Sequence, residues 1–215
     1  MQNPWEHFRQ TPHFVLDMDK PFTAWHDQNK GQFDPAKRIH LELLPEPFLG
    51  RHEVPVTLLN LNPGFSPDDQ ALLPDADFVA SLRKNLDQAT QPYPFYLLDP
   101  RNSGSPGYHW WHRRLRQLIH DVGDDGQRIV AYSILCVELF GYHSQKWDDN
   151  FLKAPSGQYA LHLAEQALNR GAIVVAMRRK WFGCVSFELG RPLVGPTATA
   201  TSPAAPTQMK HTQMV

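Results

Sequence analysis

The chain has 215 residues, of which 41% are hydrophobic, which is enough for one large domain or two small ones. A net charge of −1 excludes a strong overall positive field for nucleic acid, although a local basic rim is compatible with it. We expect no signal peptide and no membrane span, because no apolar run approaches the roughly 20 residues that a span requires. Cys136 and Cys184 form no disulfide framework, so we expect a cytoplasmic protein.

The ends of the chain differ in composition from its middle. Residues 1–53 carry scattered aromatic residues and prolines without a clear period, so we expect an arm with one or two short helices that covers the sheet. Residues 195–215 are rich in Pro, Thr, Ala and Gln and nearly free of core-forming residues. We therefore expect a single α/β domain over residues 1–194 and a disordered low-complexity tail over 195–215.

The first half of the domain contains one buried strand and a long excursion. Residues 54–61 form a short apolar run that ends in Asn-Pro-Gly, which indicates a buried parallel strand. Residues 66–108 are mostly turn-forming sequence, within which residues 75–86 fit one short helix. An excursion of this length in a compact domain is usually functional or mobile.

Residues 109–122 carry the clearest helical pattern. The apolar residues of one face are Trp111, Leu115, Leu118, Ile119 and Val122. This spacing predicts a helix that packs on the core and that ends at Gly123.

The remaining elements alternate between strand and helix. Residues 129–140 form an apolar run that predicts a second strand, interrupted near Tyr132 and Ser133. Residues 157–170 then predict a helix with Ser156 as its N-cap and Gly171 just after its end. Residues 172–177 predict a third buried strand directly after Gly171. Such tight connections favour a three-layer α/β/α fold with a short, mainly parallel central sheet.

The loop after the first predicted strand carries the sharpest functional signal. Asn62 follows the carboxyl end of that strand, where ligands bind in open parallel sheets. Pro63 limits the backbone and Gly64 permits a positive φ, so we expect a rigid loop with an amide at its tip. Such a loop can hold a water, an anion or the edge of a base. The alternative is an ordinary strand-ending turn, because Asn-Pro-Gly is common turn chemistry.

Residues 60–66, with the sequence Asn-Leu-Asn-Pro-Gly-Phe-Ser, resemble the first motif of the uracil-DNA glycosylase superfamily. The resemblance is greatest to the mismatch-specific branch, although Asn60 stands where that branch has glycine. The Gly-Tyr-His-Trp-Trp sequence of residues 107–111 resembles the aromatic helix entry of the same superfamily. The resemblance spans residues 54–182, but it is recognisable only in short blocks. Residues 59–66, 93–96 and 138–144 also resemble a family of uncharacterised bacterial proteins.

The resemblance implies a uracil-DNA-glycosylase-like fold and a nucleic-acid (DNA) or nucleotide partner. It also implies cleavage of the N-glycosidic bond of uracil or a related base that is flipped into a pocket. Asn62 matches the catalytic amide of the motif and would orient the attacking water. Phe65, Tyr93 or Phe95 would stack on the base, and the alternative for each ring is packing within the protein.

Glu138 and the residues after it are further candidates. Glu138 interrupts an apolar run near its carboxyl end, so it either points into a site or has a buried partner. It would read a base edge or act as a general base with a raised pKa. His143 would donate to a base oxygen or to the leaving group, or else lie at the surface. Ser144, His143 and Glu138 do not predict a nucleophilic triad, because adjacent residues of one loop rarely reach that geometry.

The expected site therefore has three catalytic residues, Asn62, Glu138 and His143, in one cleft. Arg178 follows the third predicted strand at the same edge, where a phosphate would lie. No His-x-x-x-His or Cys-x-x-Cys pair has a suitable context, so we expect no metal. We also expect no cofactor and a monomer. The residues that we expect to bind the substrate are Asn60, Gly64, Phe65, Tyr93, Phe95, Ser144 and Arg178.

One element of the superfamily pattern has no counterpart in this sequence. The second motif is a histidine with small and proline residues after the fourth strand, but residues 187–196 lack histidine and His211 lies in the predicted tail. Three functions therefore stay open. They are a DNA glycosylase-like hydrolase, a catalytically inactive nucleotide- or nucleic-acid-binding module of the same fold, and a small-molecule hydrolase that uses Glu138 and His143.

Overall fold

A computed structural model describes residues 1–8, 13–179 and 181 of the chain. Within these residues, one open sheet has the strand order β1-β3-β2-β4. The strands are β1 (Phe48–Leu49), β2 (Val56–Asn60), β3 (Ile134–Glu138) and β4 (Ile173–Ala176). β2 pairs in parallel with both β3 and β4, whereas β1 pairs with β3 in the antiparallel direction. The prediction of an α/β fold with a mainly parallel sheet is confirmed.

The register of β2 and β3 decides where their polar residues lie. Asn60 is aligned with Glu138, so the last residues of both strands reach the same edge of the sheet. All five residues of β3 are buried, which is typical of a parallel strand covered on both faces. The loops that follow β2 and β3 therefore leave the sheet side by side at its carboxyl edge.

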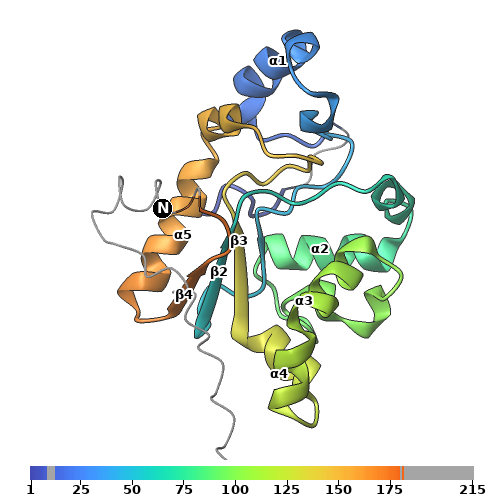
Figure 1. Ribbon diagram of the computed structural model, residues 1–215, viewed down its shortest axis with the longest axis vertical. Coiled ribbons are helices and arrows are strands. Elements are labelled where there is room, and N and C mark those ends of the chain that lie inside the picture. The colour runs from blue at the N-terminus through green and yellow to red at the C-terminus, as the bar shows by residue number, and fades with distance from the viewer. Residues whose placement is uncertain (9–12, 180, 182–215) are drawn as a thin grey trace, which may run out of the picture.

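Helices lie on both sides of the sheet (Figure 1). Helix α5 (Gly157–Asn169) contacts β2, β3 and β4 from one side. The group formed by α2 (Ala76–Leu86), α3 (Pro106–Val122) and α4 (Gly126–Ser133) lies on the other side (Figure 1). Helix α1 (Lys20–Gln28) belongs to the N-terminal arm.

The predicted strand over residues 129–140 is wrong in its first half. Those residues belong to α4, and β3 begins only at Ile134. Val130 and Ala131 of α4 are buried, whereas Ile129 and Tyr132 on the other side of the helix are exposed. A short apolar run fits a strand or a partly buried helix equally well, because periodicity does not separate the two.

Helix α3 starts earlier than predicted and is less buried. It begins at Pro106, and the Ser105 hydroxyl accepts a hydrogen bond from the Tyr108 amide at 3.0 Å. It ends at Gly123, whose φ of 87° is the positive φ that a glycine permits. The predicted apolar face is buried only at Trp111, and Leu118 is 44% exposed. The helix packs on α4 rather than along the sheet, so its later turns face solvent.

The boundaries of α5 are nearly as predicted, but its N-terminus differs. Gly171 has a φ of 76° directly after the helix, as expected for its end. The Ser156 side chain does not cap the helix, and its hydroxyl is buried without a hydrogen-bond partner among the described residues. The Ser156 amide instead donates to Asp19 at 3.0 Å.

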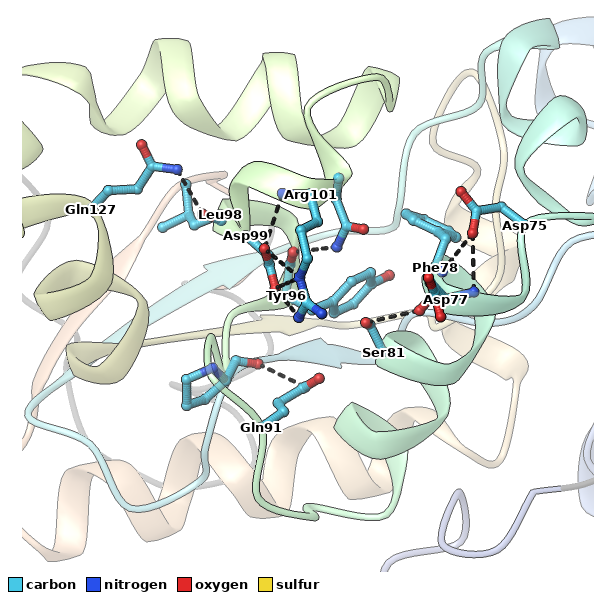
Figure 2. Close-up of polar contacts among 12 residues, drawn as sticks. Asp75, Asp77, Phe78, Ser81, Gln91, Tyr96, Leu98, Asp99, Arg101 and Gln127 are labelled. Carbon is cyan, nitrogen blue, oxygen red and sulfur yellow. Dashed lines mark hydrogen bonds and ion pairs between the residues drawn. The ribbon is translucent and has the colours of Figure 1, made fainter.

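The excursion after β2 is held together by local caps and turns (Figure 2). Asp75 caps α2 by accepting from the amides of Asp77 and Phe78, both at 3.0 Å. Asp99 caps the turn that follows and forms an ion pair with Arg101 at 2.6 Å (Figure 2). The predicted helix over residues 75–86 is confirmed, and most of the rest consists of short 3₁₀ turns and loops.

The N-terminal arm is anchored at one buried carboxyl group. Asp19 is fully buried and accepts hydrogen bonds from the Tyr142 hydroxyl at 2.7 Å and from the Ser156 amide at 3.0 Å. These bonds join the arm to the loop after β3 and to the start of α5. The arm also contributes β1, which the sequence did not predict.

In the described part of the chain, no helix combines the length and apolar character needed to cross a bilayer. The predicted tail over residues 195–215 lies outside the described residues.

We expect Asp19→Ala to lower the free energy of unfolding by about 2–4 kcal/mol, because it leaves a buried hydroxyl and a buried amide without their acceptor. Urea denaturation followed by circular dichroism measures the change. Asp17→Ala is the matched control, since Asp17 is exposed and, among the described residues, forms an ion pair only with Lys20 at the surface. Equal stabilities of the two variants would show that the anchor contributes nothing.

Candidate functional site

A cavity of about 420 Å³ lies at the carboxyl ends of β2 and β3. Most of the residues that the sequence predicted for the site line it. They are Asn60, Asn62, Gly64, Phe65, Glu138, His143, Ser144 and Arg178. The three predicted catalytic side chains thus share one cavity, to which the helix start at Pro106 and Gly107 also contributes.

Two predicted stacking residues lie elsewhere. Phe95 is fully buried and packs edge-to-face on Trp111 with ring centroids 5.0 Å apart. Tyr93 is not among the residues that line the cavity. Phe95 therefore follows the alternative prediction, which was packing within the protein.

Asn62 is fixed through its amide nitrogen. Nδ2 donates to the Pro63 carbonyl at 2.8 Å and to both the carbonyl (3.0 Å) and the hydroxyl (2.9 Å) of Ser144. No described residue donates to Oδ1. The amide therefore presents a rigid acceptor at the cavity, with its orientation set by the loop after β3.

The backbone of the Asn62 loop is held differently from the expectation. Gly64 does not adopt a positive φ, and a Cβ at this position would meet no atom within 4 Å. The conformation of the loop therefore does not require glycine. Contacts from the other loop replace that constraint, since the Ser144 amide donates to the Pro63 carbonyl at 3.3 Å.

His143, in the loop after β3, contacts both the Asn62 loop and the N-terminal arm. Its Nδ1 lies 2.8 Å from the Gly64 carbonyl oxygen and its Nε2 lies 2.9 Å from the Leu44 carbonyl oxygen. Carbonyl oxygens only accept, so both ring nitrogens must carry hydrogen for both bonds to form. In this geometry the ring has no nitrogen left for a substrate, in contrast to the predicted donor role.

Glu138 is buried, and only one of its two carboxyl oxygens has a hydrogen-bond partner among the described residues. Oε1 accepts from Asn60 Nδ2 at 3.0 Å and from the Cys136 thiol at 3.6 Å. Oε2 is buried and has no hydrogen-bond partner among the described residues. Burial raises the pKa of Glu138 to about 8, against the lowering effect of the Asn60 hydrogen bond. The carboxyl group is therefore mostly protonated at neutral pH.

Two further carboxyl groups, Glu46 and Asp69, line the cavity and were missed by the sequence analysis. The Tyr96 hydroxyl donates to Glu46, and the Ser66 amide donates to Asp69 at 2.6 Å. Burial raises the pKa of both groups. Glu46 interrupts the apolar run of residues 43–49, which is the same signal that identified Glu138.

The rest of the cavity wall is aromatic with a cationic rim. Phe65 stacks on His40 with centroids 3.4 Å apart and an interplanar angle of 7°. Trp110 and Trp147 also line the cavity, and the Arg178 side chain is exposed at its rim. This combination suits a flat, neutral polar group joined to an anionic one.

Known proteins offer no guide to this site. No family model, no curated protein and no solved structure matches the chain. Among the described residues, no cluster of three or more His, Cys, Asp or Glu side chains has an arrangement that could hold a metal ion.

We expect the free energy of unfolding to fall as the pH rises from about 5 to about 8. The raised pKa of Glu138 means that the folded state binds this proton more tightly than the unfolded state, so the stabilisation is complete below the ordinary pKa of 4.5 and is lost towards about 8. Glu138→Gln should flatten the decline in urea denaturation between pH 5 and 8, and Glu165→Gln on the exposed side of α5 should not. Identical slopes for wild type and Glu138→Gln would contradict the assignment.

We expect His143→Ala to loosen the Asn62 loop and to lower the free energy of unfolding by about 2–4 kcal/mol, because two buried hydrogen bonds are lost. Hydrogen exchange read by mass spectrometry should become faster in peptides that cover residues 60–66. His120→Ala is the control, since this histidine is exposed on α3. Unchanged exchange in residues 60–66 would show that His143 does not hold this loop.

Proposed function

We propose that the protein hydrolyses the N-glycosidic bond of uracil or a related base in DNA, with the base held in the cavity. The observation that carries this proposal is the geometry of Asn62. Three hydrogen bonds fix its Nδ2, and Oδ1 stays available as an acceptor at the cavity. A fixed acceptor beside a base-sized cavity is what the positioning of an attacking water requires.

The chemical step needs little acid–base assistance from the protein. The water oxygen forms a bond to the anomeric carbon of the sugar as the bond to the base nitrogen breaks, and the base leaves with the electron pair of that bond. The water loses one proton to solvent, and the base takes one up. An amide is a poor base, so Asn62 contributes by holding the water in line, while the cavity stabilises the departing base.

The cavity supplies surfaces for each part of a nucleotide. Phe65, Trp110 and Trp147 offer aromatic surface for the base. Arg178 at the rim offers positive charge for phosphate, and the start of α3 offers the backbone amide of Gly107. The likeness of residues 60–66 to the uracil-DNA glycosylase motif supports the same proposal.

A second candidate is a binding module that holds a nucleotide or nucleic acid without cleaving it. The state of His143 favours this candidate, because both ring nitrogens are engaged by backbone carbonyls. Within the described part of the chain, no other histidine lines the cavity. Retention of binding with no product in the assay below would select this second function.

We expect Asn62→Ala to reduce base excision by about a hundredfold or more, as is typical when a single positioning or oxyanion group is removed. The assay incubates the protein with a uracil-containing single-stranded oligonucleotide and then cleaves abasic sites with alkali. Asn29→Ala is the matched control, since this amide donates to the Trp25 carbonyl and does not line the cavity. Melting temperatures of both variants test whether each remains folded. Equal excision by Asn62→Ala and wild type would refute the role of Asn62.

A further inference from the structure

The hydrogen bonds of the Glu138 carboxyl group are divided unequally between its oxygens. Oε1 has two donors, the Asn60 amide at 3.0 Å and the Cys136 thiol at 3.6 Å. Oε2 has no partner among the described residues, although the side chain is only 3% exposed and lines the cavity. A buried oxygen without a partner is unfavourable, so a ligand in the cavity that accepts or donates here would be stabilised.

The neighbours of Glu138 decide which oxygen carries the proton. Oε1 accepts from donors, so a proton on the carboxyl group belongs on Oε2. The titratable groups nearby come from every element around the cavity. They are Glu46 on the arm, Cys136 on β3, Asp69 after β2, His143 after β3 and Arg178 after β4. Burial favours the neutral acid most strongly and Glu46 adds to this effect, whereas the hydrogen bonds from Asn60 and Cys136, and to a smaller extent Arg178, only partly oppose it.

Asn60 supplies the complementary acceptor beside this donor. Its Nδ2 is used by Glu138, which leaves Oδ1 without a hydrogen-bond partner among the described residues. Both side chains line the cavity, and the register of β2 and β3 places the two residues side by side. The pair thus presents one O–H donor next to one carbonyl acceptor.

We propose that Glu138 acts as a neutral donor to the carbonyl oxygen of the bound base, with Asn60 Oδ1 accepting from the adjacent ring N–H. This inference rests on the proposed function and names its substrate class, which is bases with a lactam edge such as uracil. Glu138 is then a specificity-determining residue that touches the base, and it does not act as a general base. Cytosine in the same orientation would place its amino group against the Glu138 O–H and its ring nitrogen against Asn60 Oδ1.

The donor also assists the chemistry of the proposed reaction. As the glycosidic bond breaks, negative charge spreads onto the carbonyl oxygens of the departing base. A hydrogen bond to an oxygen that gains charge becomes stronger in the transition state, which is the condition for catalysis. A carboxyl group kept neutral by burial is suited to this task, whereas a carboxylate would repel the leaving base.

The test compares Glu138→Gln with Glu138→Ala. Glutamine keeps a neutral N–H donor in place of the O–H at every pH, so we expect excision at pH 7 within about tenfold of wild type. Alanine removes the donor and should lower excision by about a hundredfold or more. Wild-type activity should decline as the pH rises through about 8, and this decline should be absent in Glu138→Gln. Glu165→Gln, exposed on α5, should retain the wild-type profile.

A binding measurement separates this inference from the proposed reaction. Free uracil and free cytosine are titrated while the intrinsic tryptophan fluorescence is followed, to which Trp110 and Trp147 in the cavity wall contribute. Uracil should bind at least tenfold more tightly than cytosine, with a loss of affinity above pH about 8 that Glu138→Gln removes. This result without excision would sustain the inference and reject the hydrolase.

Other outcomes overturn the inference. Excision by wild type that Glu138→Gln abolishes as fully as Glu138→Ala would show that Glu138 works as a carboxylate. Equal affinity for uracil and cytosine would reject the lactam edge. Absence of both excision and binding would reject the inference together with the proposed function.

Discussion

The parallel pairing of β2 with β3 is the constraint on which the site depends. It aligns Asn60 with Glu138 at the last residue of each strand, so an amide and a carboxyl group meet at the sheet edge. The two loops that follow then leave the same edge. Asn62 of one loop donates hydrogen bonds to Ser144 of the other at 2.9 and 3.0 Å. These bonds join the two loops, which together line the cavity.

The N-terminal arm also contributes to the cavity and holds the loop after β3. The Leu44 carbonyl of the arm accepts from His143, whose other nitrogen holds the Gly64 carbonyl. Glu46, two residues further along the arm, lines the same cavity. Because both ring nitrogens of His143 contact backbone carbonyls, neither is available to a substrate, and the Asn62 loop is held in place. The arm is therefore part of the site as well as a cover for the sheet.

The electrostatic character of the cavity follows from burial. The pKa values of Glu46, Asp69 and Glu138 are all raised because a charge in this enclosed space is poorly solvated. Glu138, whose pKa is raised to about 8, offers a neutral donor in the interior beside the aromatic surface, while Arg178 places positive charge at the rim. Such a division of charge fits a neutral base inside and a phosphate outside, which is the arrangement that the proposed function requires.

The sequence by itself determined the elements whose signals are local. Apolar runs marked β2 and β4, and Gly123 and Gly171 marked helix ends. Asn62 was found because it follows the carboxyl end of a predicted strand, and Glu138 because it interrupts an apolar run. Only the tertiary structure decided that residues 129–133 form a helix, that β1 joins the sheet, and that Phe95 packs on Trp111 away from the cavity. It also decided that both nitrogens of His143 are engaged. These features depend on contacts between residues far apart in the chain, and neither periodicity nor spacing records such contacts.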